Sequence, residues 1–288
     1  MIAHVAESGE NSGRVVFQLT AQCEMAPLAL AAALRVARSF NAGLESLVTE
    51  DPEVIDFARF DFAREVSCDG GRPQSVTVEG FEASLQSLAV LRHGEIATAA
   101  RDEGVPFHCR TLRDDRASAI AAACFENGPW NVAVLAEAVS DGTGDLVASL
   151  FQSIPDVTGF VVVGPTASRT AGPVVAIIEQ LAHVQPMLRA AERLASGATD
   201  GVHLVLFGGN ADETAWMEGQ VRLLLGDSAA EDLILAPAIA ASAQALATVL
   251  KDLQAGFVIA QIDGALLPPG GGLADLAREH DGPLFLIR

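Results

Sequence analysis

Short apolar runs alternate with amphipathic stretches along almost the whole chain. The runs are rich in β-branched residues and are bounded by Gly or Pro, which is typical of fully buried strands. The segment Thr158–Glu179 holds two such runs, separated by the polar connector Gly164–Gly172. We interpret this segment as the last strand of one α/β unit, an exposed hinge, and the first strand of a second unit.

The same alternation predicts five strands and four helices in each half of the chain. In the first half the strands are Arg14–Thr20, Leu44–Thr49, Pro106–Leu112, Trp130–Ala136 and Gly159–Val163, and the helices are Met25–Asn41, Val78–Gly104, Ala117–Glu126 and Asp145–Ile154. In the second half the strands are Val174–Glu179, Val202–Gly208, Asp232–Ala236, Phe257–Ile262 and Pro283–Ile287, and the helices are His183–Ser196, Asp212–Leu225, Ala241–Gln254 and Leu273–Glu279.

Strands that alternate with helices in this way predict parallel sheets with right-handed crossovers and helices on both faces. The predicted fold class is therefore α/β, with two tandem open parallel five-stranded sheets and domains at 1–165 and 172–288. A shift of 159 positions superposes Val15-Val16 on Val174-Val175, and Pro27 on Pro186, without a gap. Because these matches fall inside corresponding strand–helix units, they indicate a duplication.

The first half carries an insertion at Asp51–Gly71 that repeats the tetrad D-F-A-R at Asp56–Arg59 and Asp61–Arg64. As a helix, it would place Ile55, Ala58 and Phe62 on one face. Arg59 and Arg64 either recruit an anion or a partner carboxylate, or pair with neighbouring acidic side chains on a solvated face. We expect the second arrangement, in an insertion packed on the surface.

The formal charge is −19, from 18 Lys and Arg against 37 Asp and Glu. Such a charge repels phosphate backbones and anionic lipid surfaces, so neither nucleic acid nor a membrane is an expected partner. No apolar run reaches the length of a membrane span, and Met1–Gly13 lacks the pattern of a signal peptide. These observations predict a cytoplasmic location.

The sequence contains none of the common phosphate-loop, dinucleotide-binding, serine hydrolase or zinc protease motifs. The spacing of its cysteines matches neither a zinc site nor a disulfide framework. Cys23 lies near the start of a predicted helix, where a thiolate is favoured. Cys109 and Cys124 are expected in the core. His183 would lie at the carboxyl edge of the second sheet, as either a solvent-facing residue or a catalytic one. No converging acid, base or nucleophile is visible, so we do not predict an enzyme.

The doubled five-strand, four-helix unit resembles a tandem universal stress protein. The resemblance runs from Arg14 to Arg288 and is sharpest in Gly256–Arg288, where the strand F-V-I-A-Q-I, a Gly-rich loop and a short helix precede P-L-F-L-I-R. It implies a regulatory or interaction protein of the stress response. It also implies that the fifth strands, Phe160–Val163 and Leu284–Ile287, pair between the two halves, and it allows a homodimer.

In the ATP-binding branch of that family the first strand ends in Asp, and glycines after the fourth strand wrap the phosphates. Here the residue at the end of the first strand is Thr20 in one half and Glu179 in the other. The loop Ser140–Asp145, which follows the fourth strand of the first half, carries two acidic residues. Neither half retains the full pattern, so the resemblance favours a protein without ATP-binding competence. One alternative is an ATP- or AMP-binding switch, and another is an enzyme of the adenine nucleotide hydrolase-like group that uses Glu179 or His183. The residues that would hold the nucleotide are Glu179, Gly264, Gly270, Gly271 and Gly272.

Overall fold

The structure is a computed structural model of the 288-residue chain. Within it no described helix is both long and apolar enough to span a bilayer. It describes residues 13–66, 71–126, 130–140, 142–155, 157–196, 201–229, 233–238, 243–268 and 272–288.

The first half forms parallel strands that alternate with helices, as the apolar pattern predicts. The helices begin where the sequence supplies caps: Pro27 occupies the first turn of α1, and the side chain of Asp115 accepts hydrogen bonds from Ala117 N and Ser118 N at the start of α4. The strands are β1 (Arg14–Thr20), β2 (Gly43–Thr49), β5 (Phe107–Leu112), β6 (Asn131–Ala138) and β7 (Gly159–Val163), and the helices are α1 (Pro27–Ser39), α3 (Val78–Asp102), α4 (Arg116–Phe125) and α5 (Thr143–Ser153).

The second half repeats this order. Its strands β8 and β12 are buried at every position, which explains their unbroken apolar sequences. The strands are β8 (Val174–Ile178), β9 (Val202–Phe207), β10 (Leu233–Ala238), β11 (Phe257–Gln261) and β12 (Pro283–Ile287). The helices are the 3₁₀ turn η2 (Leu181–His183), α6 (Val184–Ala195), α7 (Ala211–Ala229), α8 (Ala243–Asp252) and α9 (Leu273–Glu279).

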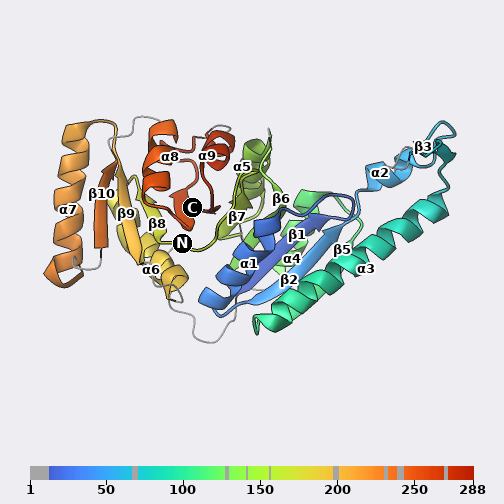
Figure 1. Cartoon of the computed structure of the whole chain (residues 1–288), viewed down its shortest axis with the longest axis horizontal. Helices are drawn as coiled ribbons and strands as arrows, with labels where there is room; N and C mark the ends of the chain where they lie inside the picture. Colours follow the sequence, from blue (N-terminus) through green and yellow to red (C-terminus); the bar gives the residue numbers. More distant parts are fainter. Residues whose placement is uncertain are drawn as a thin grey trace.

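The strands join into one ten-stranded sheet in the order β10-β9-β8-β11-β12-β7-β6-β1-β2-β5 (Figure 1). Each half contributes five parallel strands with the same internal order, and within this sheet the one antiparallel pair among the described strands is β7 with β12, in which Val162 lies opposite Leu284. The sequence predicts two five-stranded sheets, with the fifth strands paired between the halves, and in the structure the pair β7–β12 joins the two sheets into one continuous sheet. Neither β7 nor β12 is left as an exposed apolar edge.

The core lies in two layers, one on each face of the sheet. One layer includes apolar residues of α1, α3 and α6, and the other includes residues of α4, α5, α8 and α9. Each layer contains residues from both halves of the chain, so the halves share their core. Arg35 of α1 adds a polar contact between them, since its guanidinium donates to the carbonyl oxygens of Thr170 and Leu194.

The insertion after β2 forms an arm that stands away from the sheet at the end of α3 (Figure 1). It consists of α2 (Pro52–Phe57) and the two short strands β3 (Arg64–Glu65) and β4 (Gln74–Ser75). Ile55 and Ala58 are buried, as expected, but Phe62 is 67% exposed because the helix ends at Phe57. The shared helical face predicted for these three residues is therefore wrong at Phe62.

Three further expectations about burial are wrong. The spacing of Leu88 and Leu91 predicts that both lie on the apolar stripe of α3, yet both are exposed, and the buried residues of that helix are Leu85, Ala89, Ile96 and Ala100. Cys109 is exposed because β5 is the edge strand of the sheet, whereas Cys124 is buried as expected. The position of Trp216 in the middle of a predicted helix indicates a packing residue, yet its side chain is 59% exposed on α7.

Candidate functional site

Each half of the sheet has one topological switch point, the position at which open α/β folds hold a ligand, and we refer to these two positions as the first and the second crevice. The strand order reverses direction between β1 and β6 in the first half and between β8 and β11 in the second. Ligands of open parallel sheets bind beyond the carboxyl ends of the strands at such switch points. The side chains at these two places therefore decide what the molecule can bind.

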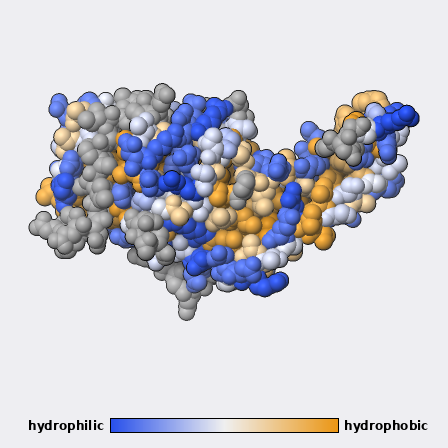
Figure 2. Space-filling model, viewed as in Figure 1, coloured by the Kyte–Doolittle hydropathy of each residue, from blue (hydrophilic) through white to orange (hydrophobic). Residues whose placement is uncertain are grey.

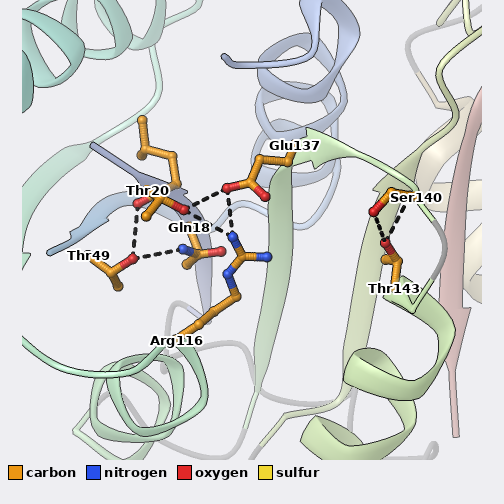
Figure 3. Close-up of polar contacts among 8 residues, drawn as sticks. Gln18, Thr20, Thr49, Arg116, Glu137, Ser140 and Thr143 are labelled. Atoms are coloured by element: carbon orange, nitrogen blue, oxygen red, sulfur yellow. Dashed lines mark hydrogen bonds and ion pairs between the residues drawn. The ribbon is translucent and has the colours of Figure 1, made fainter. Parts of the chain in front are cut away.

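The first crevice contains three interacting polar side chains, Thr20, Arg116 and Glu137 (Figure 3). Thr20 is the last residue of β1, Glu137 lies near the end of β6, and Arg116 begins α4. Thr20 Oγ1 donates to Glu137 Oε1 at 2.6 Å, and Arg116 Nη2 lies 2.6 Å from the same carboxylate oxygen and 3.0 Å from Thr20 Oγ1. The hydrogen bond from Thr20 to Glu137 thus links the two strands that border the crevice, and an ion pair joins Arg116 of α4 to the same carboxylate.

The electrostatics of this cluster keep Glu137 ionised. Burial acts to raise its pKa, but the hydrogen bonds and charge of Arg116, together with the hydrogen bond from Thr20, outweigh burial and lower the pKa below 4.5. Burial and the charge of Glu137 raise the pKa of the nearby Cys23 thiol. The reactive thiolate considered for Cys23 is therefore disfavoured.

The loop after β6 closes on itself through its hydroxyl groups. Thr143 Oγ1 accepts a hydrogen bond from the backbone N–H of Ser140 at 2.9 Å, and the two side-chain oxygens lie 3.3 Å apart (Figure 3). Gly142, with φ of +89°, makes the turn between them. The N–H of Ser140 is therefore already satisfied, and Asp145 places a negative charge in the first turn of α5.

The second crevice is occupied by the carboxylate of Glu179, which follows β8. Glu179 Oε2 accepts hydrogen bonds from the backbone N–H groups of Ala265 and Leu266, the latter at 3.3 Å, in the loop after β11. Gly264 permits this approach, because a Cβ at that position would lie 2.5 Å from both carboxylate oxygens. The side chain thus binds the N–H groups that an external anion would use.

Burial raises the pKa of Glu179, while the two backbone hydrogen bonds and the charge of His183 act to lower it. The other carboxylate oxygen, Oε1, is buried and has no hydrogen-bond partner among the described residues. His183 ends the 3₁₀ turn η2, and its Nδ1 is likewise buried without a described partner. The two side chains interact through charge, and no hydrogen bond joins them as an acid–base pair would require.

The structure brings together some of the residues predicted from the sequence. Glu179 and Gly264 are in contact, and Gly272 caps α9 with φ of +80°, where a Cβ would lie 2.8 Å from the carbonyl oxygen of Leu266. Gly270 and Gly271 lie outside the described residues. Among the residues that are described, no cluster of His, Cys, Asp and Glu side chains is placed to hold a metal ion.

Sequence reasoning missed Arg116 and Glu137. A carboxylate within the otherwise apolar strand β6 and an arginine directly after the cap Asp115 were the available signals. The partners are far apart in sequence, because Thr20 and Glu137 are separated by 117 positions. Patterns of neighbouring residues in a sequence do not indicate contacts between side chains this far apart.

The fold and the two switch points define an open α/β protein in which the same five-strand order occurs twice. No family model and no curated protein matches the sequence. Solved structures match over almost the whole chain. A universal stress protein from Archaeoglobus fulgidus DSM 4304 aligns with a TM-score of 0.67 and 10% identity, covering 95% of this chain and 96% of that one.

A putative universal stress protein from Pseudomonas aeruginosa UCBPP-PA14 aligns with a TM-score of 0.57 and 15% identity, over 99% of this chain and 94% of that one. The cytoplasmic domain of a prokaryotic cation chloride cotransporter aligns with a TM-score of 0.55 and 11% identity, over 96% of this chain and 95% of that one. The chain therefore has the fold seen in universal stress proteins. Because the sequence identities are only 10–15%, these comparisons show a similar fold and do not show a shared function.

Proposed function

We propose that this chain is a universal stress protein-like regulatory protein of the cytoplasm that acts in the stress response through protein interactions and does not bind ATP. Its two halves are copies of one duplicated unit, divided near residues 165 and 172. The observation that carries the proposal is the position of the Glu179 carboxylate on the backbone N–H groups of Ala265 and Leu266. A triphosphate would have to displace a negative charge that is covalently part of the protein.

The first crevice supports the same proposal by a different arrangement. There the positive charge of Arg116 is neutralised by Glu137, and the N–H of Ser140 is satisfied by Thr143. A triphosphate in this crevice would therefore lack a free cation from Arg116 and would meet the charge of Asp145. The overall charge of −19 adds a repulsive background at both places.

The alternative is an ATP- or AMP-binding switch in the second half, and one observation favours it. Glu179 Oε1 is buried with no described hydrogen-bond partner, and burial raises the pKa of the group. Perturbed carboxyl groups of this kind are often found at functional sites. A ribose hydroxyl could donate to that oxygen. An enzyme that uses Glu179 or His183 is a further alternative, although no nucleophile among the described residues hydrogen-bonds to either side chain.

Isothermal titration calorimetry with Mg²⁺-ATP and with AMP separates these proposals. For the wild type we expect no saturable heat up to about 1 mM nucleotide, which corresponds to binding weaker than ~4 kcal/mol. The Glu179→Ala variant should bind no worse than the wild type, because it removes the internal competitor. Glu192→Ala, which deletes an exposed carboxylate on α6 of the same half, is the matched control.

The nucleotide switch predicts the opposite result. The wild type would bind with a dissociation constant in the micromolar range, and Glu179→Ala would weaken binding about tenfold or more, or ~1.4 kcal/mol, while Glu192→Ala would not. Adenine nucleotide released from freshly purified, heat-denatured protein would point the same way. Either result would overturn the proposal.

A further inference from the structure

The arm is an ordered addition that the sheet itself does not require. In the second half β9 leads directly into α7, whereas in the first half the arm stands between β2 and α3. Ile55, Ala58 and Ala63 are each less than 10% exposed, and Arg64 donates to the carbonyl oxygens of Asp61 and Ala63 at 2.6 and 2.7 Å. The outward side chains of the arm are therefore held by a folded frame.

That frame displays an aromatic patch, which we define as Phe57, Phe60, Phe62 and Val66. Their exposed fractions are 53%, 53%, 67% and 59%. The rings contact one another, with Phe60 and Phe62 stacked at a centroid distance of 5.1 Å and Phe57 edge-on to each of them. Figure 2 shows apolar surface beside charged surface on the arm. Contiguous exposed apolar surface of this kind marks an interaction site.

The segment that carries the aromatic patch is more acidic than the chain as a whole. Residues 51–66 contain five acidic side chains against two basic ones, a net charge of −3 in 16 residues, compared with −19 in all 288. Both arginines are engaged within the arm, since Arg59 pairs with Asp56 at 3.0 Å and Arg64 binds backbone carbonyl groups. Asp61 and Glu65 are exposed and form no ion pair with another described residue. Uncompensated carboxylates therefore border the exposed rings, and they complement a cationic partner.

We propose that the aromatic patch is a docking site for a basic amphipathic helix of a partner protein. The apolar face of such a helix covers the phenylalanine rings, and its arginine or lysine side chains reach the carboxylates of Asp61 and Glu65. Guanidinium groups also bind the faces of aromatic rings. This inference rests on the protein interactions proposed above, for which it names a binding surface and a partner class. It does not depend on whether either crevice binds a nucleotide.

The dimensions of the aromatic patch match one helix. The ring centroids lie 5.1–6.2 Å apart, close to the ~5.4 Å pitch of an α-helix, so apolar side chains three or four positions apart stand over neighbouring rings. An aromatic side chain buries roughly 150–250 Å², so the half-exposed patch offers about 400 Å², half of the ~800 Å² that each partner contributes to a standard interface. The patch is thus large enough for one helical segment and too small for the face of a whole domain. We expect a dissociation constant in the micromolar range.

Fluorescence anisotropy with a labelled designed peptide tests the proposal. The probe is an amphipathic peptide of about 18 residues with leucine on one face and arginine on the other. Its control is a scrambled peptide with the same composition and charge but without an apolar face. The wild type should bind the probe at least about tenfold more tightly than the scrambled peptide. A wild type that binds both peptides alike overturns the proposal.

Substitutions in the aromatic patch locate the binding on the arm. The variant Phe57→Ser/Phe60→Ser/Phe62→Ser should lose the preference for the amphipathic probe. Phe125→Ser, which changes a phenylalanine that is 79% exposed on α4, should keep that preference. A triple variant that still prefers the amphipathic probe contradicts the proposed site.

A second pair of variants leaves the rings in place and changes only charge. Asp61→Lys/Glu65→Lys reverses two charges beside the aromatic patch, and Glu192→Lys/Asp252→Lys makes the same change in net charge on exposed side chains of α6 and α8. The first variant should bind the probe about tenfold more weakly, and the second should stay within about twofold of the wild type. Equal losses would show that the overall charge of the chain attracts the peptide, and the proposal would then be wrong.

Two other occupants of the aromatic patch predict different results. A second copy of this chain would bring two acidic segments together, and anionic lipid headgroups would meet like charge. Analytical ultracentrifugation of the wild type, alone and with vesicles that contain phosphatidylglycerol, should show neither kind of association through the patch. Self-association or vesicle binding that the triple phenylalanine variant abolishes would overturn the proposal. The nucleotide titrations use neither the peptide nor the arm, so the two proposals fail separately.

Discussion

At the scale of single residues, His280 is a base that the fold buries in its neutral form. It is 1% exposed, and burial lowers its pKa from 6.5 to about 4, with Arg169 and Lys251 adding to the effect and Asp281 opposing it. Its Nε2 has no hydrogen-bond partner among the described residues. The side chain borders a cavity of about 10 Å³, room for one water molecule. Protonation would place an additional charge in this confined site.

We therefore predict that stability falls as the pH is lowered from 6.5 to 4. In this window the unfolded chain binds a proton at His280 and the folded chain does not, so unfolding becomes easier by about 3 kcal/mol in total. Urea unfolding at pH 7 and at pH 4.5, compared between the wild type and His280→Gln, measures this contribution. The variant should lose less stability on acidification. Equal losses in the two proteins would contradict the assignment.

The sequence predicts part of the candidate site at this scale. The contact of Glu179 with Gly264 joins two positions that strand order alone places at one sheet edge, the first strand end and the loop after the fourth strand. Strand order does not predict the cluster of Thr20, Arg116 and Glu137. It depends on side-chain reach across three elements, which the order of strands does not specify.

At the scale of elements, the connector Gly164–Gly172 is docked on the second half, although its polar, Pro- and Gly-rich sequence predicts an exposed hinge. Thr166 Oγ1 donates to the carbonyl oxygen of Arg278 at 2.9 Å, and the N–H of Ser168 donates to that of Asp281 at 2.8 Å. Gly164 itself lies against the backbone of Ala277 in α9. The path from β7 to β8 is thereby fixed to the second half, which helps hold β7 beside β12.

A pair of glycine substitutions tests this docking. A Cβ at Gly164 would lie 1.8 Å from the carbonyl oxygen of Ala277, so Gly164→Ala should destabilise the protein by about 2–3 kcal/mol. Gly94 lies in the exposed part of α3 with nothing within 4 Å of its Cβ position, and Gly94→Ala should stabilise by about 0.5–1 kcal/mol. Urea unfolding of both variants measures the difference. A Gly164→Ala protein as stable as the wild type would show that the connector is free.

The sequence predicts the strands better than the helices. Strands such as β8 and β12 lie in the sheet interior, where burial on both faces leaves one apolar pattern. Helix α3 instead extends from the sheet to the arm, so its apolar positions do not share one environment. Leu88 and Leu91 face solvent although their spacing fits an apolar stripe. In a helix that extends beyond the sheet, the spacing of apolar residues alone does not predict which side chains are buried.

At the scale of the whole molecule, two five-stranded units share one sheet and two core layers, and each has a polar group of its own at its switch point. Arg116 is paired with Glu137 in one half, and the loop amides of the other half bind Glu179. The proposal that neither half binds ATP rests on these two internal interactions. Its net charge of −19 acts in the same direction.

The most direct test of this account is an NMR titration of the ¹⁵N-labelled wild type with Mg²⁺-ATP, followed at the backbone amides of Ala265 and Leu266. These amides hold Glu179 in the structure. The account predicts that their resonances show no saturable shift up to about 1 mM nucleotide. Saturable shifts at these two amides would show that ATP displaces the carboxylate, and would contradict the central claim.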